Sequence, residues 1–209
     1  MALGVARVTA ATSGWTEQTV EALAEGERLA KKALDLDASN AQAHALLGDV
    51  YLNRAREPAQ YDRAREEDEK AIELNPNDAV SHAALGGVLV FAGYPEEAVR
   101  QFEIAARLDP GMNLVRLYPS GWAYYLVGRY EDAVRVGESA ARENPADYFP
   151  HACLAASYAQ LGRTDDAARA ASSTWHAWPF FRVDTFVSQF KREVDRTLIA
   201  DGLRKAGLK

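Results

Sequence analysis

Cysteine is almost absent from this chain of 209 residues, which carries Cys153 alone. One cysteine cannot form a disulfide within the chain, so nothing in the composition indicates an oxidising compartment. Long apolar runs are also missing, because no stretch approaches the roughly 18 apolar residues that a membrane-spanning helix needs. The first 15 residues hold one arginine and no sustained apolar segment. We therefore expect no membrane insertion, no secretory signal and a cytoplasmic location.

Excess positive charge is lacking too. The net charge is −6, which disfavours nucleic acid and anionic membranes as general partners. The content of 48% apolar and 26% charged residues is ordinary for a soluble globular chain. We expect a protein or peptide partner, with a homo-oligomer as a second option.

Motifs of catalysis are absent as well. The sequence contains no HExxH, no phosphate-binding glycine loop and no paired CxxC. Residues 188–191, Ser-Gln-Phe-Lys, match the SxxK pattern of acyl-enzymes, but the companion motifs of that pattern are missing. We expect no catalytic residue, no cofactor and no metal site, and hence no enzyme.

What the sequence does have is a ladder of four prolines. Pro76, Pro110, Pro145 and Pro179 follow one another at intervals of 34, 35 and 34 residues. A period of about 34 residues, in a chain rich in alanine, leucine and charged residues, is typical of the tetratricopeptide repeat (TPR), in which each repeat is a helical hairpin. The ladder therefore predicts an all-α fold, a TPR-type right-handed superhelical solenoid of antiparallel helix pairs with a C-terminal capping helix.

Small residues recur in phase with the prolines. The first helix of each repeat (helix A) should carry a glycine or alanine, and the second (helix B) an alanine, so that the two helices approach closely. We predict an irregular segment at 1–14, an array at 15–182, and a capping helix and tail at 183–209. Within the array, the predicted units are a partial repeat at 15–40 and full repeats at 41–78, 79–113, 114–147 and 148–182.

The turn between helices A and B repeats as well. Gly93, Gly128 and Gly162 end helix A, where glycine adopts a left-handed backbone at low cost. Two carboxylates follow each time in the first turn of helix B, which suits the positive end of the helix dipole. Because this acidic pair recurs at one structural position, we interpret it as a helix start rather than as metal-binding or acid–base chemistry.

Two residues disturb the regular pattern. Asp68 stands where Phe102 stands in the third repeat, so we expect a loosely packed second repeat, which also has four extra residues between its helices around 55–60. Pro119 falls inside the expected helix A of the fourth repeat, where proline is unfavourable. Both features weaken the predicted regularity of these two repeats.

Three histidines, His44, His82 and His151, share the fourth position of helix A. Equivalent residues on successive packed helices lie about 8–10 Å apart, whereas a zinc–imidazole bond is about 2 Å long. We therefore expect these histidines to pack between helices A and B rather than to form a metal ladder.

The segment after Pro179 is no longer a repeat. Between 184 and 200, apolar residues recur at helical spacing, which predicts one amphipathic helix. These residues are Phe186, Val187, Phe190, Val194, Leu198 and Ile199. Such a helix would cap the open end of the array. In a second interpretation, it folds into the groove of the array and occupies it as an internal ligand.

The concave surface of a TPR array is lined by helix A residues, and the TPR positions carried over to this chain give a predicted protein-binding groove. Its members are Gln42, Asp49, Val80, Ala83, Val90, Tyr118, Trp122, Tyr125, Phe149 and Ala156. The Lys, Asn and Arg set with which chaperone-binding TPRs clamp a C-terminal carboxylate is missing. The aromatic members suit an apolar peptide or helix. Alternatively, they pack against the C-terminal helix or a second copy of the chain.

Most of the chain from Trp15 onward also resembles the C-terminal TPR region of bacterial proteins with class III adenylate/guanylate cyclase domains. The resembling stretches are 41–48, 92–99, 154–162 and 201–209. The resemblance implies a regulatory or scaffolding part without the catalytic domain. We thus expect a non-catalytic interaction module that binds a peptide or helix in its groove. The alternative is an oligomerisation or regulatory region of a cyclase-like signalling protein.

Overall fold

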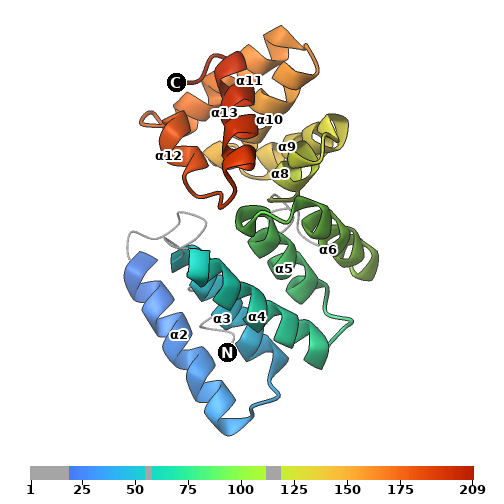
Figure 1. Ribbon diagram of the computed structural model, residues 1–209, viewed down its shortest axis with the longest axis vertical. Helices are drawn as coiled ribbons and strands as arrows, with labels where there is room; N and C mark the ends of the chain where they lie inside the picture. Colours follow the sequence, from blue (N-terminus) through green and yellow to red (C-terminus); the bar gives the residue numbers. More distant parts are fainter. Residues whose placement is uncertain (1–18, 55–57, 112–118) are drawn as a thin grey trace.

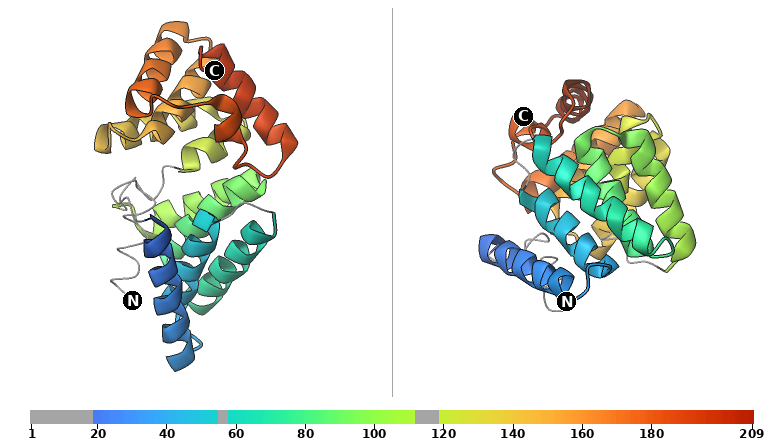
Figure 2. Two further views of the ribbon diagram at one scale, coloured as in Figure 1. Left: turned by 90° about the vertical axis from the view of Figure 1, so that its left-hand side faces the viewer. Right: turned by 60° about the horizontal axis from the view of Figure 1, so that its bottom comes forward.

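The computed structural model describes residues 19–54, 58–111 and 119–209, and these residues form helices joined by turns, without a strand. Successive helices stack along the long axis of the molecule (Figure 1, Figure 2). In chain order they are α2 (Thr19–Leu36), α3 (Ala41–Arg54), α4 (Pro58–Leu74), α5 (Ala79–Ala92), α6 (Pro95–Leu108), α8 (Pro119–Leu126), α9 (Tyr130–Glu143), α10 (Tyr148–Gln160), α11 (Thr164–Ala177), α12 (Val183–Val187) and α13 (Glu193–Lys205).

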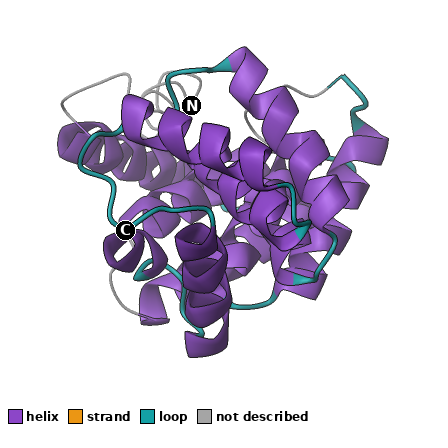
Figure 3. Cartoon of the chain, turned by 90° about the horizontal axis from the view of Figure 1, so that it is seen from above, coloured by secondary structure: helices purple, strands orange, loops and turns teal. Residues whose placement is uncertain are grey.

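Consecutive helices pair as helix A and helix B of the predicted repeats. The pairs are α3 with α4, α5 with α6, α8 with α9 and α10 with α11, while α2 packs on α3 as the helix B of the partial first repeat. Seen from above, the described chain is helical nearly throughout, with loops confined to the connections (Figure 3). The predicted all-α solenoid of antiparallel helix pairs is confirmed. The irregular segment predicted at 1–14 and part of the insertion, 55–57, lie outside the described residues.

Close contacts within the hairpins explain the recurring glycines of helix A. A Cβ atom on Gly86 in α5 would lie 2.9 Å from the ring of Phe102 in α6. Such a separation is shorter than any ordinary carbon–carbon contact. Only glycine therefore allows the end of the Phe102 ring to reach helix A at this position.

The turns between helices A and B have the predicted backbone. Gly93, Gly128 and Gly162 adopt φ angles of 89°, 78° and 72°, in the left-handed region that glycine favours. The acidic pairs lie in the first turns of α6, α9 and α11. No group of three or more metal-ligating side chains gathers within the described parts of the chain. The position of the acidic pairs in these first turns confirms that they lie at helix starts.

Asp68 and Pro119 are the two positions that depart from the repeat pattern. Asp68 is fully buried in contact with Gly48, so the expectation of a loosely packed second repeat is wrong at this position. The carboxylate occupies the space at Gly48 that the Phe102 ring occupies at Gly86 in the third repeat. The described part of α8 begins at Pro119. Because residues 112–118 lie outside the described residues, the expected disturbance of helix A by Pro119 stays a prediction.

The hydrophobic core is concentrated in the C-terminal half. One cluster of buried side chains extends from α5 through α11 and includes both helices of the C-terminal segment, α12 and α13. A smaller cluster joins α2 to α3 around Leu23, Leu46 and Val50. Among the described helices, none combines the length and the apolar character needed to cross a membrane.

The prediction of one continuous helix over 184–200 is wrong, because the chain turns between α12 and α13 at 188–192. The N–H of Lys191 donates to the carbonyl of Phe91 in α5, at 2.8 Å, instead of continuing the helical ladder. This tertiary hydrogen bond redirects the chain. As a result Val194, which the single-helix pattern places on the apolar face, is 62% exposed.

Candidate protein-binding groove

Aromatic side chains from three A helices form a continuous surface on one side of the array. Trp122 and Tyr125 come from α8, Phe149 from α10 and Phe91 from α5. The ring centroid of Trp122 lies 5.5 Å from that of Tyr125 and 6.1 Å from that of Phe149. Phe91 and Phe149 are 6.3 Å apart. These separations are typical of aromatic pairs in tilted or edge-to-face contact, and we call these four residues the aromatic surface.

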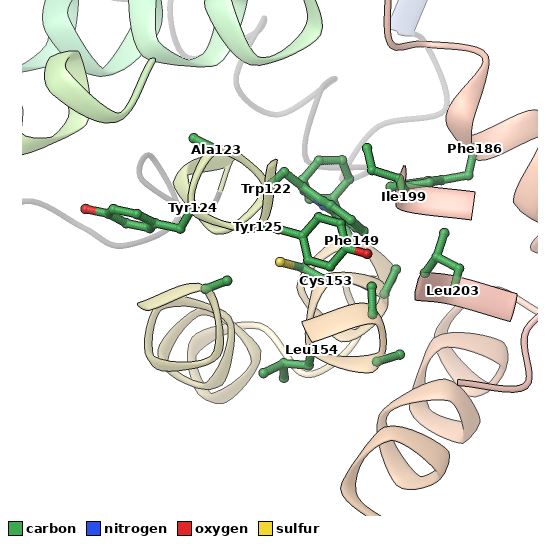
Figure 4. Packing of buried hydrophobic residues seen from close by; sticks show 14 of the residues in the cluster. Trp122, Ala123, Tyr124, Tyr125, Phe149, Cys153, Leu154, Phe186, Ile199 and Leu203 are labelled. Atoms are coloured by element: carbon green, nitrogen blue, oxygen red, sulfur yellow. The ribbon is translucent and has the colours of Figure 1, made fainter. Parts of the chain in front are cut away.

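The C-terminal segment of the same chain covers the aromatic surface. The ring of Phe186 in α12 lies 5.3 Å from that of Trp122 and 5.7 Å from that of Phe149. Phe190, in the turn after α12, lies 5.2 Å from Phe91. Figure 4 shows Phe186, with Ile199 and Leu203 of α13, facing Trp122, Tyr125 and Phe149. The segment therefore closes the last repeats from the side of the A helices.

Helix α13 approaches the aromatic surface closely at one point. A Cβ atom on Gly202 would lie 2.0 Å from the hydroxyl oxygen of Tyr125. That hydroxyl donates to the carbonyl of Leu198 at 3.0 Å and accepts from the side-chain amide of Gln160 at 3.0 Å. Burial raises the pKa of Tyr125, partly offset by the Gln160 hydrogen bond. The hydroxyl therefore stays protonated and keeps donating.

The turn at 188–192 attaches the segment to the preceding repeats. Tyr61 in the first turn of α4 donates its hydroxyl to the carbonyl of Gln189. The Nζ of Lys191 lies 3.2 Å from a carboxylate oxygen of Asp62. Together with the bond to the Phe91 carbonyl, these contacts link the C-terminal segment to α4 and α5. In the bonds with Tyr61, Phe91 and Tyr125, the segment contributes main-chain atoms.

Internal bonds hold the shape of the segment. The guanidinium of Arg196 donates to the carbonyls of Phe190 and Lys191, at 3.1 and 3.0 Å. Arg192 donates two hydrogen bonds to Asp195, at 3.0 and 2.7 Å. These contacts stabilise the turn and the start of α13, so the two helices reach the aromatic surface in a fixed arrangement.

The structure distributes the predicted groove residues over three environments. Gln42 and Val80 are exposed, Asp49 is half-buried, and Tyr118 lies outside the described residues. The remaining six are buried: Ala83, Val90, Trp122, Tyr125, Phe149 and Ala156. The structure thus places the aromatic members beneath the C-terminal segment, apart from the exposed members on α3 and α5. Their role in binding a partner stays a prediction.

Sequence reasoning missed three residues of this site: Phe91, Gln160 and Gly202. Phe91 directly follows the last groove position of its helix, and Gln160 ends α10. Gly202 had a detectable signal, because a glycine inside a helical stretch costs about 1 kcal/mol relative to alanine and often marks a close approach. Nothing in the sequence indicated which residue it approaches.

The three histidines are structural. His44, His82 and His151 each place Nε2 within hydrogen-bond distance of the main-chain carbonyl six residues earlier, at 3.2, 3.0 and 3.0 Å. A carbonyl only accepts, so Nε2 carries the proton in each case. The histidines thus link the start of helix A to the preceding turn. Nδ1 of His44 and of His82 also lies 2.7 and 2.6 Å from Glu67 and Gln101 of the following helix B, so these two pack between helices A and B as expected.

A hollow of about 510 Å³ lies between α9, α10 and α11. Its charged residues are largely engaged with one another: Asp166 pairs with Arg163 and Arg169, and Tyr158 donates to Glu138 at 2.6 Å. The guanidinium of Arg163 also lies over the Tyr158 ring. These contacts link α9, α10 and the start of α11.

Comparison with known families identifies the repeat. The family model for the tetratricopeptide repeat matches residues 79–103 and 149–172. The first match spans α5 and most of α6, and the second spans most of α10 and α11. No curated protein matches the chain.

Several solved structures share the fold. PilW, a widely conserved type IV pilus biogenesis factor, is 16% identical with a TM-score of 0.64, over 98% of this chain and 89% of PilW. MamA is 19% identical with a TM-score of 0.58, over 77% and 91%. YrrB, described as a TPR protein with an unusual peptide-binding site, is 21% identical with a TM-score of 0.57, over 83% and 86%. At these identities the likeness shows the fold alone, and nothing in it supports the cyclase resemblance.

Proposed function

We propose that this chain, a tetratricopeptide repeat protein, is a non-catalytic interaction module that binds an apolar peptide or helix of a partner protein on its concave surface. The observation that carries the proposal is the C-terminal segment itself. A helical segment of this chain buries Phe186, Phe190, Ile199 and Leu203 on the aromatic surface, each to 2% exposure or less. Docking of an amphipathic helix in an apolar groove is a common mode of peptide recognition.

The hydrogen bonds to the segment also support recognition of a peptide. Tyr61, Tyr125 and the carbonyl of Phe91 contact main-chain atoms of the segment. Such bonds hold a helix or turn without specifying its side chains, while the apolar pockets select the anchors. The description of YrrB as a peptide-binding TPR protein agrees with this use of the fold.

The proposal is tested by cutting the connection between the segment and the array. Pro179 and Phe180 are exposed, so a site-specific protease sequence can be inserted between them. After cleavage, a fluorescent synthetic peptide of residues 183–209 should exchange into the groove with saturable binding, measured by anisotropy. Because two buried aromatic anchors are lost, the F186A/F190A peptide should bind at least about tenfold more weakly, the equivalent of 1.4 kcal/mol.

The control is a V194A peptide, since Val194 is 62% exposed and should contribute little. Its affinity should equal that of the unchanged peptide. If the cleaved chain unfolds, or if no labelled peptide exchanges into it, the aromatic surface is an ordinary core and the proposed function fails.

Self-association is the alternative use of the same region, with the repeats acting as an oligomerisation or regulatory part. Two exposed apolar side chains favour self-association: Phe180, just before the segment, is 78% exposed, and Val194, on α13, is 62% exposed. Light scattering over a range of concentrations separates the two functions, because a constant monomer mass would contradict self-association. The cytoplasmic location and the exclusion of nucleic acid as a partner rest on composition and stay predictions.

A further inference from the structure

The contact between Tyr125 and Gly202 points to the chemistry of the partner. Resting on the function proposed above, we propose that the partner segment is an amphipathic helix that carries a glycine where Tyr125 points, next to aliphatic anchors, and that it binds in place of α13. In α13 this pattern is Ile199, Gly202 and Leu203, an aliphatic residue followed by glycine three positions later and a second aliphatic residue directly after it.

The space at this point admits only glycine. A Cβ atom on Gly202 would lie 2.0 Å from the Tyr125 hydroxyl, 3.1 Å from Cζ of the same ring and 3.2 Å from Cβ of Ala156. The Tyr125 side chain is fully buried, and Trp122 packs against it at 5.5 Å. Since the ring is enclosed, it cannot swing aside at low cost. A helix with a larger residue here has to sit farther from the aromatic surface.

The close approach also creates a polar contact. The Tyr125 hydroxyl accepts from Gln160, so its own proton is left for a second partner, the carbonyl of Leu198. That carbonyl lies one turn before Gly202 on the same face of the helix. A larger residue at the glycine position would lengthen this bond as well as the apolar contacts. The size of the residue at the glycine position therefore also determines the length of the hydrogen bond that the Tyr125 hydroxyl donates to the helix.

The two faces of α13 show why the partner helix is amphipathic. Ile199 and Leu203 are 0% exposed and belong to the main core cluster, whereas Val194 is 62% exposed. Asp201, Arg204 and Lys205 are exposed as well. The groove contacts one apolar stripe and leaves the polar face free. A partner therefore needs the apolar stripe and the glycine, while its outer residues can vary.

The location of α13 is that of a ligand on the array. Its principal packing is on α10, with further contacts to α8 and α12. Both α8 and α10 are A helices that already pair with their own B helices, α9 and α11. The hairpins are thus complete without α13. An external helix of the same pattern can take its position once α12 and α13 move away on the connection at 178–182.

The test uses the intact chain with its own segment weakened. In the F186A/F190A chain, the array is unchanged but the segment loses two anchors, so the equilibrium shifts towards the open groove. A fluorescent peptide of residues 183–209 should bind this chain at least about tenfold more tightly than it binds the unchanged chain, because the closed state reduces the apparent affinity. Circular dichroism should show equal helicity of the two chains within the repeats.

The specificity arm compares two alanine substitutions in the peptide. G202A should weaken binding at least about tenfold, although alanine favours the helix. D201A is the matched control at the exposed neighbouring position and should bind at least as well as the original. Introducing Y125F into the F186A/F190A chain removes the hydroxyl that G202A would meet. The loss of affinity caused by G202A should then be several-fold smaller than with Tyr125 present. An effect of G202A on the peptide alone would not depend on residue 125 of the chain.

Each outcome separates the two proposals. Equal binding of the G202A and D201A peptides, or an unchanged penalty with Y125F, overturns the glycine rule while the groove itself stands. If the peptide binds the protease-cleaved chain but not the F186A/F190A chain, displacement of α13 from the uncut chain is overturned and the proposed function stands. Failure of both chains to bind refutes the proposed function. If the F186A/F190A chain forms dimers in light scattering, a second copy of the chain supplies the helix through its α13. That result overturns the assignment to a separate partner.

Discussion

The carboxyl group of Asp68 in α4 lies directly against Gly48 in α3: a Cβ atom on Gly48 would stand 2.0 Å from Oδ1 of Asp68. Within the described structure, both carboxyl oxygens are buried and have no hydrogen-bond partner. Burial raises the pKa of Asp68 well above its ordinary value, and the charges of Asp49, Glu67 and Glu69 raise it further. Asp68 thus makes the contact with Gly48 that Phe102 makes with Gly86 in the next repeat.

We predict that Asp68→Asn stabilises the protein increasingly as the pH rises. Because burial raises the pKa of Asp68 in the folded state, the unfolded chain releases this proton at a lower pH than the folded chain does. The stability of the unchanged protein therefore falls as the pH rises above about 4, the ordinary pKa of aspartate. At pH 7, Asp68→Asn should raise the unfolding free energy by about 1.4 kcal/mol for each unit by which the folded-state pKa of Asp68 exceeds its ordinary value, because the amide does not titrate. Below pH 4 the two proteins should be nearly equal.

The measurement is urea denaturation between pH 3.5 and 7.5, at pH values where the protein is folded before urea is added. Glu66→Gln on the same helix is the control, since Glu66 is exposed and its replacement should leave the pH profile unchanged. A constant difference between Asp68→Asn and the unchanged protein at all pH values would contradict a titrating Asp68.

Two adjacent glycines of α5 should respond in opposite ways to alanine. A Cβ atom on Gly86 would meet the Phe102 ring at 2.9 Å, whereas none of the described atoms lies within 4 Å of one on Gly87. Gly86→Ala should therefore destabilise the protein by about 1–3 kcal/mol through overpacking. Gly87→Ala should stabilise it by up to about 1 kcal/mol through helix propensity. Equal thermal midpoints of the two variants would show that helix A does not need a small residue at position 86.

Trp122 should behave as a core residue. It is 0% exposed, and its ring lies among Tyr125, Phe149 and Phe186. Trp122→Ala should lower the unfolding free energy by about 3–5 kcal/mol, whereas Val194→Ala should change it by no more than about 0.5 kcal/mol. Calorimetry or denaturant titration decides. A neutral Trp122→Ala would mean that the C-terminal segment does not rest on α8 in solution.

Cys153 should be unreactive in the folded protein. The thiol is 1% exposed, and burial raises its pKa to about 12. Since the thiolate is the reactive form, modification of Cys153 at pH 8 requires the chain to unfold. At an unfolding free energy of about 5 kcal/mol, fewer than about one molecule in a thousand is unfolded. Labelling with a chromogenic disulfide should be about a thousandfold slower in buffer than in denaturant. Fast native labelling would contradict the close packing of Cys153 in α10 against Gly121 in α8.

Much of the fold could be predicted because a repeat packs on its neighbours in the sequence. The left-handed glycines at 93, 128 and 162, the acidic helix starts and the histidine contacts all depend on residues within one hairpin or the adjacent turn. Their positions follow from the period. The apolar stripe with Phe186 and Phe190 was also visible as a pattern, although its division into two helices was not.

The sequence by itself determined the all-α repeat architecture, the phase of each hairpin and the lack of recognisable catalytic motifs, because those properties are encoded in local spacing and composition. Only the tertiary structure decided that the C-terminal segment lies over Trp122 and Tyr125, that Gly202 meets the Tyr125 hydroxyl, and that Asp68 is buried without a hydrogen-bond partner among the described residues. Each of these contacts joins residues whose meeting depends on how helices stack, and spacing along the chain carries no record of that geometry.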